Sequence, residues 1–170
     1  GVLITSTGRS HREVKRCCDA IHSILPEHKS LFGTKGSSQL QRVRLFLKIV
    51  DDKALWSIGV CTLTVADLKA LRRATQPYLR RLLREPRREA ETTGDYVHRC
   101  NSLLKKMCDE GQVIPVQTLA LRQVHRYAGH LARKVTMPHQ RILQAATQHK
   151  PLDWQNTVAM LNRGSQGHPK

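Results

Sequence analysis

Basic side chains are concentrated between Lys69 and Arg88, on what the apolar spacing predicts to be one helix and the linker that follows it. This stretch holds eight lysines and arginines against a single acid, Glu85, which gives a local net charge of 8 − 1 = +7. A guanidinium group meets phosphate oxygens as a two-pronged fork, so an arginine-rich helix favours contact with a phosphate backbone. The residues predicted to bind nucleic acid here are Lys69, Arg72, Arg73, Arg80, Arg81 and Arg84.

A second basic stripe lies on a helix predicted over about residues 118–134. Its apolar positions with helical spacing are Leu121, Val124, Ala128 and Leu131. Arginines fall on nearly the opposite face, around Gly129, so that one face packs while the other offers cations. The predicted binding residues of this helix are Arg122, Arg126, His130 and Arg133. For His125 and His130 the pattern equally allows a hydrogen-bonding role within the fold.

No set of residues in the sequence makes a self-contained active site, and we predict no catalytic residue. Two clusters of cysteine and histidine, around Cys17 and around Cys100, lack the paired spacing of structural zinc sites. Because these cysteines lie on apolar stripes, packing in the core is favoured over metal binding. The acidic doublet Asp51-Asp52 is interpreted as a solvated helix end. The chain by itself therefore predicts no enzyme, metal or cofactor.

Composition narrows the possible partners. The 170 residues include 29 Lys and Arg against 13 Asp and Glu, a net charge of +16, which excludes acidic tails and acidic buffers and favours a phosphate-rich partner. Aromatic residues are only 4% of the chain, too few for recognition by base stacking, so we expect contact with the backbone.

Other features of the sequence indicate the cellular compartment and the extent of the chain. The five cysteines are an odd number and no secretory leader is recognisable, which indicates a reducing, intracellular compartment, either nuclear or cytoplasmic. No run of about 18 apolar residues predicts a membrane span. The chain opens within an apparent β-strand and without methionine, so we expect it to be a piece of a longer polypeptide.

The periodicity predicts a mainly α fold, with six to seven helices in an irregular bundle and a short extended N-terminal segment. Residues 55–63, rich in β-branched and aromatic side chains, are interpreted as extended, which allows one small two-stranded pairing with residues 1–5. A capping box is expected at Ser10–Glu13, and further caps at Thr64–Asp67 and Asp95. Gly111 is expected to end the helix that Asp95 begins, and the last two helices are expected after Pro138 and Asp153.

Apolar spacing also assigns the faces of two helices. In the helix after the Gly33–Ser38 loop, the residues predicted to point inward are Leu40, Val43, Leu47 and Val50, and those predicted to point outward are Arg42, Arg44 and Lys48. In the arginine-rich helix, the apolar stripe is Leu68, Leu71, Thr75, Tyr78 and Leu82, with a kink expected at Pro77.

The order of several short motifs resembles the region that follows the reverse transcriptase palm in non-LTR (LINE-type) retrotransposons. In chain order these motifs are Gly1-Val-Leu-Ile-Thr5, Ser10-His-Arg-Glu13-Val14, Leu55-Trp56 followed by Thr62-Leu63-Thr64, Leu79-Arg-Arg-Leu-Leu83, and Leu121-Arg-x₃-Arg126-Tyr-Ala-Gly-His-Leu-Ala-Arg133. The resemblance extends from Gly1 to about Trp154. Two positions depart from the family pattern, since Gly59 stands where a glutamate is common and Cys61 where a tryptophan is common.

The resemblance implies a division of the chain into three parts. Residues 1–90 would hold a strand remnant and thumb-like basic helices, residues 91–164 connector helices with the arginine stripe, and residues 165–170 a disordered tail. The acidic residues that bind Mg²⁺ in the polymerase lie upstream in the family, so magnesium is expected only in that separate catalytic domain.

Two functions follow as hypotheses. The first is a nucleic-acid-binding module of an RNA-directed DNA polymerase, which grips an RNA/DNA duplex or hybrid and works with an upstream catalytic domain of the same polyprotein. The second is a decayed or co-opted helical fragment that has no enzymatic activity and binds acidic protein partners.

Overall fold

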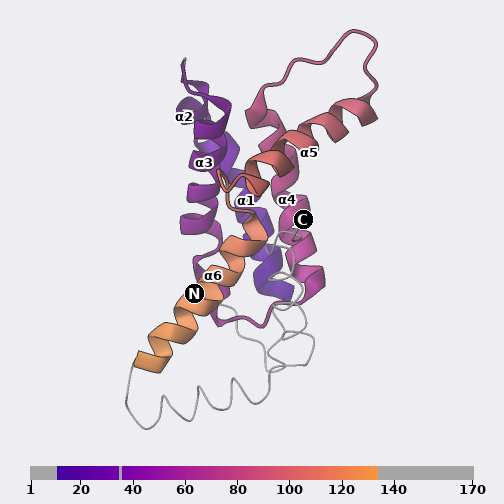
Figure 1. Ribbon diagram of the computed structural model, residues 1–170. Helices are drawn as coiled ribbons and strands as arrows, with labels where there is room; N and C mark the ends of the chain where they lie inside the picture. The colour runs from indigo at the N-terminus through magenta and orange to yellow at the C-terminus, as the bar shows by residue number, and fades with distance from the viewer. Residues whose placement is uncertain (1–10, 35, 134–170) are drawn as a thin grey trace.

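The computed structural model describes residues 11–34 and 36–133, with no side-chain description for residues 131–133. This part of the chain forms six α-helices and no strand, which confirms the mainly α prediction (Figure 1). The helices are α1 (His11–Glu27), α2 (Lys29–Gly33), α3 (Gln39–Ile49), α4 (Val65–Leu83), α5 (Thr93–Asp109) and α6 (Val116–Arg133). The predicted N-terminal extended segment, the two last helices and the 165–170 tail lie outside the described residues.

The core forms where α1, α3, α4 and α6 meet, while α5 extends away from the other helices (Figure 1). Phe46 of α3 is fully buried and its ring lies 6.1 Å from the ring of Phe32 and 5.9 Å from that of Tyr78. These contacts join α2, α3 and α4. Cys17 and Cys100 are also buried in this core, as their apolar stripes predicted.

Helix boundaries follow local capping chemistry. Thr64 and Asp67 form the predicted capping box of α4, with the Asp67 amide donating to Thr64 Oγ1 over 3.2 Å and the Thr64 amide donating to Asp67 Oδ2 over 3.0 Å. The prediction that Asp95 caps α5 is wrong. Thr92 is the N-cap, because its extended backbone lets the hydroxyl accept from the Asp95 amide over 3.1 Å. Gly111 follows α5 with the expected positive φ of 69°.

The extended prediction for residues 55–63 is wrong for its central part. Residues Val50–Ala54 form a π-helical turn, η1, and Trp56–Val60 form a 3₁₀ turn, η2. Leu55 and Ile58 are both fully buried, a spacing of three that suits a 3₁₀ turn and not the two-residue alternation of a strand. The turn packs tightly on α6, where a Cβ added to Gly59 would lie 3.0 Å from the Gln123 carbonyl oxygen. Tertiary packing against α6 therefore overrides β propensity here.

The prediction that Arg42 points outward is also wrong. Its side chain is buried at the contact between α3 and α4, where Nε donates to the Leu82 carbonyl over 2.9 Å and Nη1 donates to the Ser37 carbonyl. The stem fills space between the helices while two carbonyl oxygens replace water around the guanidinium group. The other two outward predictions, Arg44 and Lys48, are confirmed as exposed.

Glu13 ties α1 to η2. The predicted partner in its capping box, Ser10, lies outside the described residues. The Glu13 carboxylate is fully buried and accepts from Arg16 Nε over 3.0 Å and from the hydroxyl of Ser57. Arg16 also covers the ring of Trp56 at 5.7 Å from its centroid. A charged group buried in this way needs such partners, so the cluster fixes η2 beside α1.

None of the helices in the described part of the chain is long and apolar enough to cross a membrane.

Candidate nucleic-acid interface

Within the described residues, no acidic side chain forms an ion pair with the six cations predicted on α4. Apart from the half-buried Arg80, all of them are exposed. Arg80 and Arg72 are hydrogen-bonded only to neutral side chains, with donor–acceptor distances of 3.4 Å to Asn101 and 3.3 Å to Gln76. No ion pair recorded for the described residues involves any of the six. Their charges are therefore available to an external anion.

Glu85, the single acid within the basic stretch, is occupied elsewhere. Its carboxylate accepts from Arg99 Nη1 of α5 over 2.9 Å and from Gln39 Nε2 of α3 over 2.5 Å. Arg99 also bonds Glu91 over 2.8 Å, and this contact lowers the pKa of Glu91 to about 2. The sequence did not identify Arg99. By binding the two acids that flank the α4–α5 linker, it keeps them from the α4 arginines.

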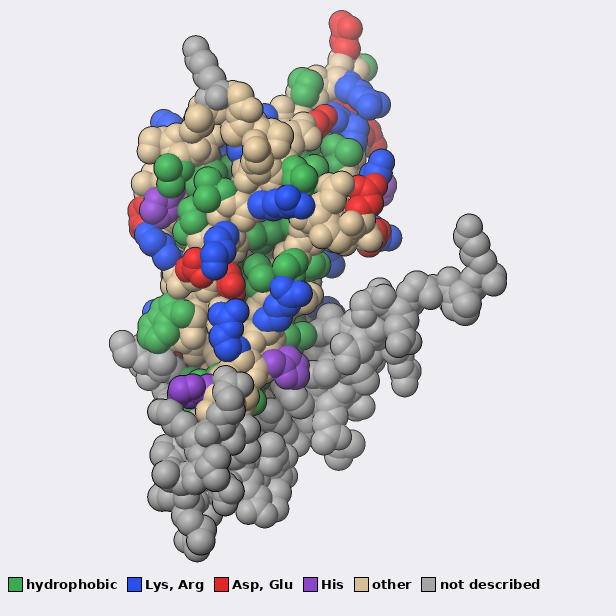
Figure 2. Space-filling model, turned by 60° about the vertical axis from the view of Figure 1, so that its left-hand side comes forward, with side chains coloured by type: hydrophobic (Ala, Val, Ile, Leu, Met, Phe, Trp, Pro, Cys, Tyr) green, Lys and Arg blue, Asp and Glu red, His purple; other side chains and the backbone are tan. Residues whose placement is uncertain are grey.

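A groove of about 400 Å³ lies between α3 and the start of α6, and its lining brings cations of the two helices together. Arg44 and Lys48 come from α3 and Arg122 from α6, while Leu47 and Leu119 belong to the apolar part of the lining. Arg44 Nε is held by the Gln112 carbonyl at 2.7 Å, and Arg122 has no recorded partner among the described residues. Figure 2 shows several blue side chains spaced over this face of the molecule, with green side chains around them and red side chains beside one of them.

One acidic residue, Asp51, also lines this groove, and its neighbour Asp52 belongs to the same turn. Lys48 pairs with Asp52 at 2.9 Å, and this hydrogen bond raises the pKa of Lys48 while the nearby charge of Arg126 opposes the shift. Asp51 accepts from Gln123 Nε2 over 2.7 Å. Exposed pairs of this kind are weak and are screened by salt, so Lys48 can exchange its carboxylate partner for a phosphate. The interpretation of the acidic doublet as a helix end agrees with its place in η1.

The stripe predicted on α6 is confirmed in its described part. Leu121 and Val124 are buried and Ala128 is half-buried, whereas Arg122, Arg126 and His130 are exposed. The sequence missed Arg44 and Lys48 as companions of this stripe, although their i, i+4 spacing on an exposed helix face was a usable signal. The last predicted residue, Arg133, ends α6, and its side chain lies outside the description.

The structure does not join all the predicted cations into one site. Arg122 lines the α3–α6 groove, whereas Arg81 and Arg84 line a different pocket beside α2. Within the described residues, no group of three or more His, Cys, Asp or Glu side chains is placed to hold a metal ion.

Comparison of the chain with protein-family models, with curated proteins and with solved structures finds no match.

Proposed function

We propose that this protein binds the phosphate backbone of a nucleic-acid duplex through the exposed cations of α3, α4 and α6. One observation carries the proposal: no predicted cation with a described side chain is recorded within 4.0 Å of a carboxylate. Cations that no nearby carboxylate neutralises repel one another, and binding a polyanion relieves that repulsion while releasing counterions. The acid that would have neutralised them, Glu85, is held by Arg99.

The small number of exposed aromatic rings also favours contact with the nucleic-acid backbone over base stacking. Among the described aromatic residues, only Trp56 and Tyr127 are exposed, at 52% and 39%. Duplexes with A-form geometry are held largely through shape and backbone, which needs cations more than stacking surfaces. The proposed ligand is therefore an RNA/DNA hybrid or an RNA or DNA duplex.

The resemblance to LINE-type reverse transcriptases supports a finer proposal. In that setting the helices form the thumb and connector that grip template and primer, and the palm that binds Mg²⁺ and performs polymerisation belongs to another part of the polypeptide. This chain would supply affinity and register for the duplex, and its described residues supply no acid cluster for the chemistry itself.

The test compares salt dependence in two double variants. Arg122→Ala/Arg126→Ala removes two cations of the proposed interface, and the slope of log affinity against log salt is expected to become shallower by about 1.8. Lys15→Ala/Lys105→Ala is the matched control, since both lysines are exposed and lie on α1 and α5. Its slope should equal that of the parent protein.

Equal effects of the two double variants would contradict the proposed interface, because they would indicate diffuse attraction to the whole basic surface. The alternative function, binding of acidic proteins, is favoured if polyglutamate displaces the duplex at the same charge concentration.

A further inference from the structure

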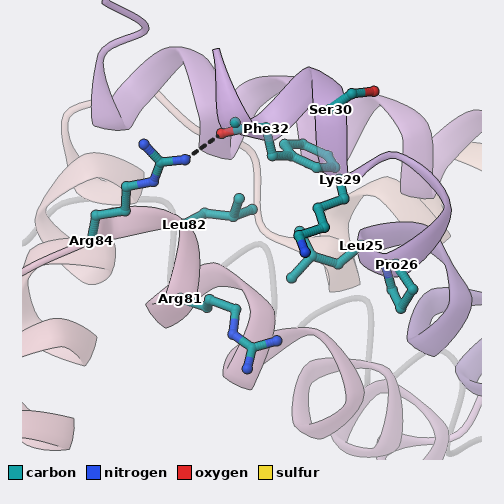
Figure 3. A pocket seen from close by; sticks show the side chains of 9 residues that line it. Leu25, Pro26, Lys29, Ser30, Phe32, Arg81, Leu82 and Arg84 are labelled. Atoms are coloured by element: carbon teal, nitrogen blue, oxygen red, sulfur yellow. Dashed lines mark hydrogen bonds between the residues drawn. The ribbon is translucent and has the colours of Figure 1, made fainter. Parts of the chain in front are cut away.

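A second pocket, of about 800 Å³, lies where the end of α1, the short α2 and the end of α4 meet (Figure 3). Apolar side chains of Leu25, Phe32 and Leu82 contribute to its lining. Its charged lining residues are all cations, Lys29, Arg81 and Arg84, and no carboxylate belongs to it. A volume of this size is typical of sites for small organic molecules.

Arg84 is held in place on one side of this pocket. Its Nη2 donates to the carbonyl of Phe32 over 2.7 Å, drawn as a dashed line in Figure 3. Its backbone ends α4 in the left-handed region, with φ of 51° and ψ of 31°. Residues other than glycine adopt this region at a cost, and ligand clamps are among the places where such strain persists. The anchored guanidinium keeps other N–H groups for a ligand.

Lys29 and Arg81 supply two further charges. Within the described part of the chain, neither side chain has a recorded hydrogen bond or ion pair, and both residues are exposed. Figure 3 shows Lys29 extending from α2 toward Leu25, while Arg81 projects from α4. The pocket thus combines apolar surface with three cations.

A fourth cation lies behind the pocket lining. Arg42 is only 7% exposed, and its Nε donates to the carbonyl of Leu82, one of the lining residues. Its recorded partners are carbonyl and hydroxyl oxygens, with no carboxylate among them. Burial and the charge of Arg84 both lower the pKa of Arg42. Buried charges are normally paired with an opposite charge. An anionic ligand bound in the adjacent pocket would bring such a charge close to Arg42.

We propose that the pocket binds a small organic phosphate monoester, with its phosphate at Lys29 and Arg81, Arg84 as a further cation of the lining, and its apolar body against Leu25 and Leu82. A phosphate monoester carries nearly two negative charges at neutral pH, which suits a site with several cations and no acid better than a carboxylate does. Because part of the lining is apolar, the pocket is expected to bind an organic phosphate more tightly than inorganic phosphate. The pocket shares Arg81 and Arg84 with the cations predicted for the duplex interface, and it adds Lys29 and the apolar lining to them.

Calorimetric titration with phenyl phosphate, inorganic phosphate and phenol tests both halves of the pocket. Phenyl phosphate is expected to bind about tenfold more tightly than either of the others, since only it uses both the cations and the apolar surface. Lys29→Glu should weaken phenyl phosphate about tenfold, whereas Lys15→Glu, an exposed lysine outside the pocket, should leave it unchanged.

A steric variant tests the location without changing charge. Gly33 belongs to the pocket lining, and a Cβ added there meets nothing within 4 Å. Gly33→Leu should therefore fold normally and weaken phenyl phosphate by occupying pocket volume.

The inference is overturned if phenyl phosphate binds no more tightly than inorganic phosphate, or if Lys15→Glu weakens it as much as Lys29→Glu does. Duplex affinity, measured in parallel, separates the two proposals. A parent protein that binds phenyl phosphate but shows no salt-dependent duplex binding refutes only the proposed function. A parent protein that binds duplex but not phenyl phosphate refutes only the pocket.

Discussion

The contact between Gly59 and α6 predicts a stability difference between two chemically identical substitutions. A Cβ at position 59 would lie 3.0 Å from the Gln123 carbonyl oxygen and 3.0 Å from Tyr127 Cβ. Neither atom can rotate away, because both are fixed to the α6 backbone. Gly59→Ala must therefore displace η2 from α6 by some tenths of an ångström, and overpacking of this kind costs about 1–3 kcal/mol.

Gly33→Ala is the matched control. An added Cβ there has no atom within 4 Å, and the residue belongs to α2. Removing a glycine from a helix at a compatible position is expected to be neutral or to stabilise by up to about 1 kcal/mol. Gly59→Ala should therefore lower the urea midpoint, whereas Gly33→Ala should leave it unchanged or raise it. The m-values of both variants should equal that of the parent protein.

Equal midpoints for Gly59→Ala and the parent protein would refute the close approach of η2 and α6. That result would also contradict the described position of α6 along η2, because η2 packs against the segment of α6 that carries Gln123 and Tyr127.

Three further predictions concern stability. Burial raises the pKa of the Cys17 thiol to about 12 from an ordinary value of 9.0, so the contribution of Cys17 to stability should be constant below pH 9 and fall as pH rises toward 12. A Cys17→Ala variant with an equally steep alkaline loss of stability would contradict this. Thr64→Ala removes the side-chain half of the α4 capping box and should cost about 1 kcal/mol in urea unfolding, and an unchanged midpoint would show that the cap contributes nothing. Phe46→Ala should cost about 3–5 kcal/mol, because the ring is fully buried between two other aromatic rings; a loss below about 1 kcal/mol in thermal or urea unfolding would contradict the described core.

Helix faces were predictable from the sequence wherever a long apolar stripe was present. Leu121 and Val124 are buried and Arg122 is exposed, as the 3.6-residue period requires. Caps were predictable where a serine or threonine precedes an acid by three residues, as at Thr64, but at α5 the acid was mistaken for the cap itself.

Two errors arose from information that is not local. Residues 56–60 have strand-like composition, yet they form a 3₁₀ turn because α6, more than 50 residues later, packs onto Gly59. Arg42 was placed in solvent by its charge, yet α4 supplies a carbonyl at 2.9 Å that lets it be buried. No periodicity within one helix reveals a partner contributed by another helix.

The candidate site was predictable in composition but not in arrangement. The exposed arginines of α4 and α6 were identified from spacing alone. Their separation into a groove with Arg44 and Lys48 and a pocket with Lys29 depends on how α3 and α2 pack, and the sequence does not contain a local signal for that packing.

The most direct test of the central claim is the salt dependence of the parent protein's affinity for an RNA–DNA hybrid, measured by fluorescence anisotropy. About six phosphate contacts predict a slope of log affinity against log salt near −5. A slope near zero would contradict the claim that the exposed cations of this protein bind a phosphate backbone.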